Sequence, residues 1–235
     1  MEETKVINSE EMQTIAAGRA KTYAVLAALY TTPPAEELAA MIRAGGLAPE
    51  GSGALGAAAN ELTEFFRQAA SEGYSGNELV AEHTRLFVLP SGVVPHESFY
   101  LDENKRVGGH VTSGVQRYYE AAAARHSSTC LELPDHVGVE LDFMKFLCDV
   151  EEQFWKEPNW DGVQKCLELE NGFLAGHLLR WHRALCERIL VETNLDIYRA
   201  LARLTIEFLD AERVLVPTLT AEIDSEWRTA CVSES

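Results

Sequence analysis

The sequence lacks the cysteine pattern of a disulfide-stabilised protein. Its 235 residues include five cysteines, an odd number, and no two of them form a Cys-x-x-Cys pair. Scattered cysteines of this kind are typical of reduced thiols in the cytosol. The N-terminus, Met-Glu-Glu-Thr-Lys, is not a basic start followed by an apolar run, so it does not resemble a secretory signal. Together these absences predict a cytoplasmic protein.

Long apolar runs and an excess of basic residues are also missing. No stretch approaches the roughly 18 consecutive apolar residues of a membrane-spanning helix, so we expect no integral membrane protein. The 37 acidic residues outnumber the 20 basic ones, which gives a net charge of −17. Such a field repels nucleic acid and attracts basic partners. Solubility alone would also explain this charge, so a basic peptide partner is compatible with it but not demonstrated by it.

Catalytic and metal-binding signatures are absent as well. There is no Walker A sequence, no Gly-x-Ser-x-Gly, and no cysteine with a motif-defined partner. Residues 51–56 match the letters of a dinucleotide-binding loop, but a loop precedes them where that site requires a strand. His177 and His182 are five apart, whereas metal-binding pairs on a helix need a spacing of three or four. We therefore expect no catalytic residue, no resident cofactor and no metal site.

What the chain does have is helical periodicity along most of its length. Apolar residues recur at spacings of three, four and seven, as in Leu174, Leu178 and Leu185, and such stripes are core faces of packed helices. There is no alternating strand pattern, no internal repeat, and no linker rich in Pro, Gly or Ser. The sequence predicts one all-α domain over 1–235, a bundle of about eight helices at 9–31, 35–43, 54–70, 77–88, 111–125, 136–157, 160–190 and 194–222.

Residues 89–110 interrupt this helical pattern. They lack helical periodicity and contain two prolines and three glycines. An irregular connection of this length is uncommon in a compact domain unless it is functional or mobile. We therefore predict one long functional loop over about 89–110.

Two segments combine apolar, acidic and imidazole side chains where helix meets loop. The first, 82–103, contains Glu-His-Thr-Arg-Leu-Phe and Pro-His-Glu-Ser-Phe-Tyr, and the second, 133–144, contains Leu-Pro-Asp-His. Loops held by rigid helices commonly carry function. Plainer explanations stay open. Asp135 would cap the next helix for about 1 kcal/mol, and Leu86 and Phe87 would be core residues.

The order and spacing of these blocks resemble the TorD/DmsD family of cytoplasmic molybdoenzyme maturation chaperones. That family carries Glu-x-x-Arg-Leu-Phe, then Pro-x-Glu-Ser-x-Tyr, and later Pro-Asp-His followed by Glu-Leu-x-Phe-Met. The likeness covers about 75–210 and departs at His96, where the family often has an aromatic residue. The matching residues are Glu82, Arg85, Leu86, Phe87, Pro95, Glu97, Ser98, Tyr100, Pro134, Asp135, His136, Glu140, Leu141, Phe143 and Met144.

The resemblance implies a chaperone that binds the twin-arginine signal peptide, or the apo form, of a molybdenum-cofactor oxidoreductase and delays its export until cofactor is inserted. Such a peptide joins a basic segment to an apolar one, so its receptor needs carboxylates beside a hydrophobic groove. His136 is the expected titrating group, which would make affinity vary between about pH 5 and 8. The implied peptide-binding residues are Asp135, Glu97 and Glu140 for the arginines, Leu86, Phe87, Pro134 and His136 for the groove, and Tyr100 and Ser98 beside them.

Other functions remain open at this point. A nitrate-reductase-type (NarJ-like) assembly factor would share the architecture and differ in its client. Weak GTP binding is associated with some family members, although the missing phosphate-binding loop argues against a nucleotide-handling protein. A plain helical subunit of a larger complex is a further alternative. The expected partners are the twin-arginine leader and catalytic subunit of a molybdoenzyme, together with molybdenum cofactor biosynthesis proteins, and the chain would act as a monomer or a domain-swapped dimer.

Overall fold

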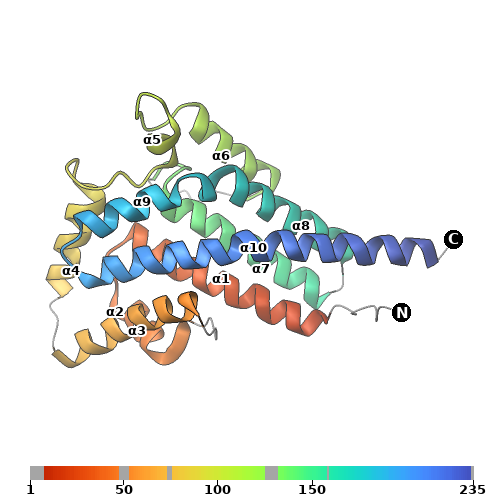
Figure 1. The fold of residues 1–235 in the computed structure, drawn as a ribbon, viewed down its shortest axis with the longest axis horizontal. Coiled ribbons are helices and arrows are strands. Elements are labelled where there is room, and N and C mark those ends of the chain that lie inside the picture. The colour runs from red at the N-terminus through yellow and green to blue at the C-terminus, as the bar shows by residue number, and fades with distance from the viewer. Residues whose placement is uncertain (1–7, 48–52, 73–75, 125–131, 158, 234–235) are drawn as a thin grey trace.

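The computed structural model describes residues 8–47, 53–72, 76–124, 132–157 and 159–233. Within these ranges no residue lies in a named strand, and one isolated bridge joins His96 and His136. The predicted all-α class is confirmed. The helices are α1 (Ser9–Thr31), α2 (Glu36–Met41), α3 (Ala54–Glu72), α4 (Gly76–His83), α5 (Glu97–Leu101), α6 (His110–Ala121), α7 (Val137–Lys156), α8 (Trp160–Phe173), α9 (Leu179–Glu192) and α10 (Asp196–Ser233), with π-helical segments η1 (Ile42–Gly46), η2 (Thr84–Val88) and η3 (Leu174–Leu178) (Figure 1).

The predicted helices are present with small shifts at their ends. The described residues contain ten α-helices rather than about eight, because η3 divides the predicted 160–190 helix and α5 was not predicted. The N-cap of α1 is Asn8. The side chain of Asn8 accepts hydrogen bonds from the backbone N–H groups of Glu10 and Glu11 at 3.1 and 3.5 Å.

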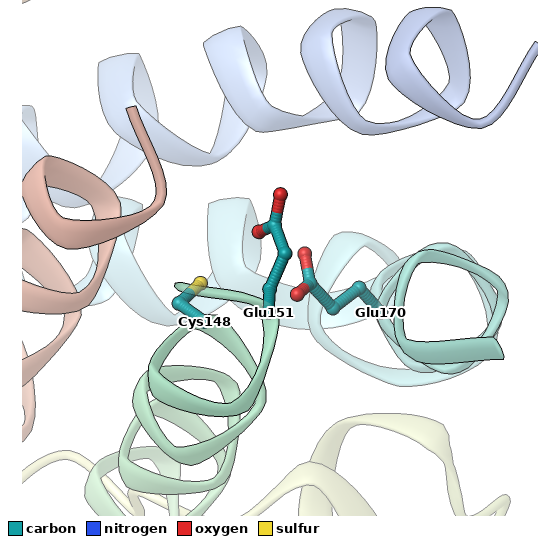
Figure 2. Close-up of side chains that lie close together, drawn as sticks. All are labelled: Cys148, Glu151 and Glu170. Carbon is teal, nitrogen blue, oxygen red and sulfur yellow. The ribbon is translucent and has the colours of Figure 1, made fainter. Parts of the chain in front are cut away.

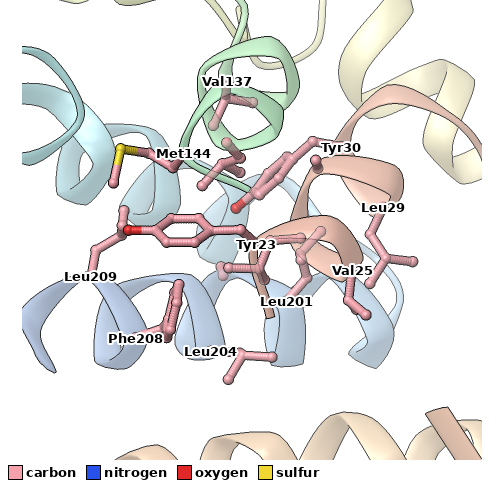
Figure 3. Packing of buried hydrophobic residues seen from close by; sticks show 14 of the residues in the cluster. Tyr23, Val25, Leu29, Tyr30, Val137, Met144, Leu201, Leu204, Phe208 and Leu209 are labelled. Carbon is pink, nitrogen blue, oxygen red and sulfur yellow. The ribbon is translucent and has the colours of Figure 1, made fainter. Parts of the chain in front are cut away.

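The core lies between α1, α7 and α10. Helices α1 and α7 pack along each other, and α10 crosses them and also contacts α3, α8 and α9. Figure 3 shows Tyr23 of α1 and Phe208 of α10 in this core, with ring centroids 4.7 Å apart in an edge-to-face arrangement. Such aromatic pairs contribute about 0.5–1.5 kcal/mol beyond their buried area.

A glycine allows α7 to begin directly against the end of α1. A Cβ atom at Gly138 would lie 2.6 Å from Cγ2 of Thr31 and 3.1 Å from the carbonyl oxygen of Ala27. The first turn of α7 is therefore fixed against α1 by close backbone packing. This contact places the Pro-Asp-His block, which immediately precedes α7, at one end of the bundle.

Residues 89–110 are not one irregular loop, and this part of the prediction is corrected. They contain α5, which packs against α6 and α9. The turn that leads to α5 closes on η2, because the N–H of Val93 donates to the carbonyl of Leu86 at 2.7 Å. A Cβ at Gly92 would lie 2.3 Å from that same carbonyl oxygen, so only glycine fits this turn.

Three of the five cysteines, Cys148, Cys166 and Cys186, are buried free thiols, as predicted. Cys130 lies outside the described residues, and so does the side chain of Cys231. No helix within the described part of the chain is both long and apolar enough to cross a membrane.

Candidate functional site

The two segments that carry the family blocks lie side by side in the structure. The N–H of Glu97 donates to the carbonyl of Asp135, and the N–H of Val137 donates to the carbonyl of Pro95, both at 2.9 Å. The bridge between His96 and His136 lies between these two bonds. The Glu-Ser block at the start of α5 is thus fixed to the Pro-Asp-His block at the start of α7.

Asp135 holds α5 in place and does not cap α7, so the capping interpretation is wrong. Its side chain is fully buried, and Oδ2 accepts hydrogen bonds from the backbone N–H and the hydroxyl of Ser98 at 3.0 and 2.5 Å. The Ser98 hydroxyl oxygen in turn accepts from the N–H of Gly108 at 2.9 Å. One aspartate therefore anchors both α5 and the chain that leaves it.

His136 supplies the cap of α7 and is neutral. Its Nδ1 accepts a hydrogen bond from the N–H of Gly138 at 3.0 Å, which requires that this nitrogen carry no proton. Burial, and then the neighbouring His96, lower the pKa of His136 to about 3. The expectation that His136 titrates between about pH 5 and 8 is therefore wrong.

Glu97 and Glu140 bring two more carboxyl groups to the same place. Both side chains are fully buried. Glu97 Oε2 lies 2.8 Å from Nδ1 of His177, and Glu140 Oε2 accepts from Nε1 of Trp181 at 3.2 Å. Burial raises the pKa of Glu140 well above its usual range, and the neighbouring Glu97 carboxyl raises it further. Glu97, Asp135 and Glu140 form a buried acidic cluster between α5 and the start of α7.

The acidic cluster has too few donors. Within the described residues, no arginine or lysine donates to any of its three carboxyl groups. The Nδ1 atom of His96 lies 4.0 Å from Asp135 Oδ1, beyond hydrogen-bond distance. One oxygen of each carboxyl group, Glu97 Oε1, Asp135 Oδ1 and Glu140 Oε1, is buried without a hydrogen-bond partner. Buried polar atoms are almost always paired, so three orphaned acceptors at one place indicate a site that lacks a donor.

The apolar residues predicted for the groove lie mostly inside the protein. Leu86 is fully buried, and the Phe87 ring packs edge-on against Tyr30 and Tyr198 at 5.7 and 5.6 Å. The carbonyl oxygen of Pro134 accepts from the hydroxyl of Tyr119 at 2.7 Å. In this structure Leu86 and Phe87 are core residues, and a direct role in peptide binding stays a prediction.

Tyr100 connects the acidic cluster to a surface pocket. Its ring packs on Trp181, the donor to Glu140, with centroids 5.3 Å apart, and its hydroxyl is buried without a partner. On its other side Tyr100 lines a pocket of about 550 Å³ between α5 and α9. The other residues of this pocket are Phe99, Lys105, Ala184, Glu187, Arg188, Val191 and Glu192. The α5 block thus has one acidic, buried face and one aromatic, accessible face.

The Glu-x-x-Arg part of the first block is structural. Glu82 accepts from Nε of Arg85 at 2.7 Å and from the N–H of Asn194 at 2.7 Å. The hydrogen bond from Arg85 lowers the pKa of Glu82 to about 2. This ion pair ties α4 and η2 to the connection between α9 and α10.

A second buried cluster was not predicted. Arg19 of α1 lies among three buried glutamates, with Nη1 2.6 Å from Glu151, Nη2 2.9 Å from Glu212, and a further ion pair to Glu170. The sequence signal was an arginine within the apolar stripe of 9–31. Its partners, however, are 132 to 193 residues away along the chain, so no local pattern identifies them.

This arginine-centred cluster contains the group that most resembles metal ligands. Figure 2 shows Cys148 and Glu151 of α7 and Glu170 of α8 gathered together, and one ligand atom from each lies within 4.8 Å of the others. Arg19 donates to both glutamates, so a cationic group already compensates them. A metal ion would have to displace a buried arginine.

The glycine-rich segment 51–56 begins outside the described residues, and from Ala54 onward it forms the start of α3. This agrees with a loop that enters a helix. Weak GTP binding stays a prediction, since none of the described pockets includes this segment.

Comparison with known proteins identifies relatives over the same region. A family model described as nitrate reductase delta subunit matches residues 48–187, more than half of the chain. Two relatives called chaperone protein TorD, from Vibrio cholerae serotype O1 strains O395 and N16961, are each 24% identical over 231 residues, which is 94% of this chain and 99% of the relative. A solved structure of a candidate redox enzyme maturation protein from Archaeoglobus fulgidus is 20% identical with a TM-score of 0.46, covering 83% of this chain and 93% of the other. The chain belongs to the nitrate reductase delta subunit family, and its predicted membership of the TorD-type maturation chaperones is confirmed.

Proposed function

We propose that this chain is a system-specific chaperone of the cytoplasm that binds the twin-arginine signal peptide, or the apo form, of a molybdenum-cofactor oxidoreductase. It would delay export of that client until cofactor insertion is complete. Its chemistry is binding without catalysis. The observation that carries the proposal is the acidic cluster, where three buried carboxyl groups meet and the described part of the chain supplies no arginine or lysine to them.

An arginine side chain from outside fits this shortage of donors. A guanidinium group has five N–H donors in a fixed fork, stays protonated, and pairs with two carboxylates at once. The orphaned oxygens of Glu97 and Glu140 are the acceptors that it would use. The net charge of −17 would favour the approach of a basic peptide.

The arginine would reach the acidic cluster from the pocket on the outer side of α5. Tyr100 lines that pocket and contacts the indole that bonds Glu140, so its ring lies between the pocket and the cluster. Phe99, Val191 and Ala184 would contact the apolar part of the peptide. Because Glu97, Asp135 and Glu140 are fully buried, entry of an arginine requires α5 to move away from the start of α7.

The test is calorimetric titration with a synthetic twin-arginine leader peptide of a molybdoenzyme from the same organism. The control peptide has both arginines changed to lysine. We expect micromolar or tighter binding that weakens at least tenfold with the lysine peptide, since lysine cannot make the bidentate contact. Equal affinity for the two peptides would contradict the role of the acidic cluster.

The protein variant for this test is Asp135→Asn. The amide oxygen can still accept from Ser98, whereas alanine would leave the two Ser98 donors unpaired and lower stability for a reason unrelated to peptide. Asp135→Asn should weaken the arginine peptide more than the lysine peptide. Glu151→Gln, which changes a buried glutamate outside the acidic cluster, serves as the matched control.

A nitrate-reductase-type assembly factor is the second candidate, because the matching family model is described as nitrate reductase delta subunit. Such a factor would bind the folded portion of an apo catalytic subunit. The discriminating measurement is binding of that subunit with and without its leader. Affinity that survives removal of the leader would favour the assembly factor, and loss of binding would favour the signal-peptide chaperone.

A further inference from the structure

The carboxyl groups of Glu97 and Glu140 lie next to each other in the acidic cluster, and contact with Glu97 is among the causes that raise the pKa of Glu140. Each has one oxygen already in use, by His177 and by Trp181 respectively. The remaining Oε1 atoms are both buried and have no other partner. Two ionised carboxylates offer only acceptors, so a bond between them requires a proton. One proton between the two Oε1 atoms satisfies both.

The surroundings of this pair favour a retained proton. Apart from each other, the ionisable groups that face the two carboxyls are Asp135 before α7, Tyr119 of α6 and His177 of η3. Two of the three carry no positive charge in any protonation state. The next imidazoles, those of His96 and His136, have pKa values that burial lowers, so neither adds a cation. The pair therefore shares a buried site with another acid and with no permanent cation.

The same chain shows what happens when a guanidinium is present. In the arginine-centred cluster, Arg19 donates to Glu151, Glu170 and Glu212, and the chain supplies the cation from α1. A guanidinium can thus bridge three buried carboxyl groups at once. The Glu97–Glu140 pair has the acceptors of such an arrangement and lacks the arginine.

We propose that the proton shared by Glu97 and Glu140 is exchanged for an arginine of the bound peptide and released to solvent. This inference rests on the proposed function. In the free chain one carboxyl is protonated and bonds the other, which is ionised. In the complex both are ionised and bridge the guanidinium of one arginine, and the single shared proton leaves. Peptide affinity then increases with pH over the range in which the free pair is protonated.

The experiment is calorimetric titration of the full chain with the arginine leader peptide in buffers of different ionisation enthalpy, repeated from pH 6 to pH 8. The dependence of the observed heat on the buffer gives the number of protons released. We expect about one proton, and an affinity gain approaching tenfold per pH unit while the pair stays protonated. His177 Nδ1 contacts Glu97 Oε2, so the proton count is compared with that of Glu140→Gln, which leaves His177 in place.

Glu140→Gln separates the shared proton from other sources. Its amide donates permanently to Glu97 and has no proton to release, so the released proton and the pH dependence should both disappear while weaker binding remains. Glu151→Gln should release as many protons as the unmodified chain. The infrared absorption of protonated buried carboxyl groups should be weaker in Glu140→Gln than in the unmodified chain, and peptide binding should weaken it in the unmodified chain but not in Glu140→Gln.

Binding without proton release, or equal release from Glu140→Gln, would overturn the inference and leave the proposed function standing. No binding at any pH in any buffer would overturn the proposed function and this inference with it.

Discussion

Two buried acidic clusters in the described part of the chain differ in one component, an arginine side chain. The arginine-centred cluster has three glutamates and Arg19, and it joins α1, α7, α8 and α10. The acidic cluster between α5 and α7 also has three carboxyl groups, but the described part of the chain provides it with no arginine or lysine. The first set of acceptors is used within the fold, and the second includes oxygen atoms that receive no hydrogen bond from the described residues.

The difference has an energetic basis. Burying a charge is costly unless it is paired and hydrogen-bonded. Arg19 offsets that cost for its glutamates, and Tyr23 and Trp155 donate further bonds to Glu212 and Glu151 at 2.9 and 3.0 Å. The acidic cluster reduces the cost by keeping a proton. The acidic cluster can therefore bind a cation such as arginine in exchange for this proton.

The largest expected effect is on the arginine-centred cluster. Arg19→Met keeps much of the side-chain volume but leaves three buried glutamates without a cation. Breaking a buried ion pair from one side typically costs about 3–5 kcal/mol. Urea unfolding at pH 7 should show a loss of this size, and a loss below about 1 kcal/mol would contradict the account of this cluster.

The same substitution in both clusters sharpens the comparison. Glu151→Gln removes a charge-assisted bond to Arg19 and should cost about 1.5–3 kcal/mol of unfolding free energy. Glu140→Gln replaces a shared proton with a permanent donor and should stay within about 1 kcal/mol of the unmodified chain. Equal losses in the two variants would show that the clusters are not different in kind.

Stability should also depend on pH through Glu170. Burial raises the pKa of Glu170 to about 8, above the ordinary value of 4.5 that applies to the unfolded chain. Between these values the folded chain retains a proton that the unfolded chain has lost, so the stabilising contribution is complete below pH 4.5 and disappears as pH rises to about 8. The free energy of unfolding should fall more steeply from pH 5 to pH 8 for the unmodified chain than for Glu170→Gln. Identical slopes would contradict the raised pKa of Glu170.

The smallest expected effect concerns the bonds that hold α5. Ser98→Ala removes the hydroxyl that donates to Asp135 and accepts from Gly108, and it should cost about 1 kcal/mol of unfolding free energy. If α5 has to leave α7 for the peptide to enter, this variant should bind peptide at least as tightly as the unmodified chain. Weaker binding would indicate that Ser98 contacts the peptide directly.

The sequence predicted the helices well because their apolar stripes repeat over many turns, as in 160–190. It did not predict α5, since five residues that bury Glu97 and Ser98 have no periodicity to detect. It also assigned Asp135 to the nearest helix terminus, whereas its partner is Ser98, 37 residues away. Hydrogen bonds between distant segments are decided by packing, so the two clusters became visible only in the structure.

The sequence predicted which residues form the site better than it predicted whether their side chains are buried. Glu97, Ser98 and Asp135 are brought together as the family blocks implied. Their burial was not expected, because the spacing of residues in a loop carries no information about which face is covered. A half-buried aromatic ring instead lines the pocket at Phe99, a residue that the family pattern leaves unspecified.

The most direct test of the central claim is a double-mutant cycle between the peptide and the acidic cluster. Calorimetry would compare the leader peptide with a version in which one arginine is glutamine, each against the unmodified chain and Glu97→Gln, with Glu151→Gln as the reference. We predict a coupling energy of about 1.5 kcal/mol or more between the peptide arginine and Glu97, and about zero for Glu151. Independent, additive effects of the arginine and Glu97 would contradict the claim that the acidic cluster receives the arginine.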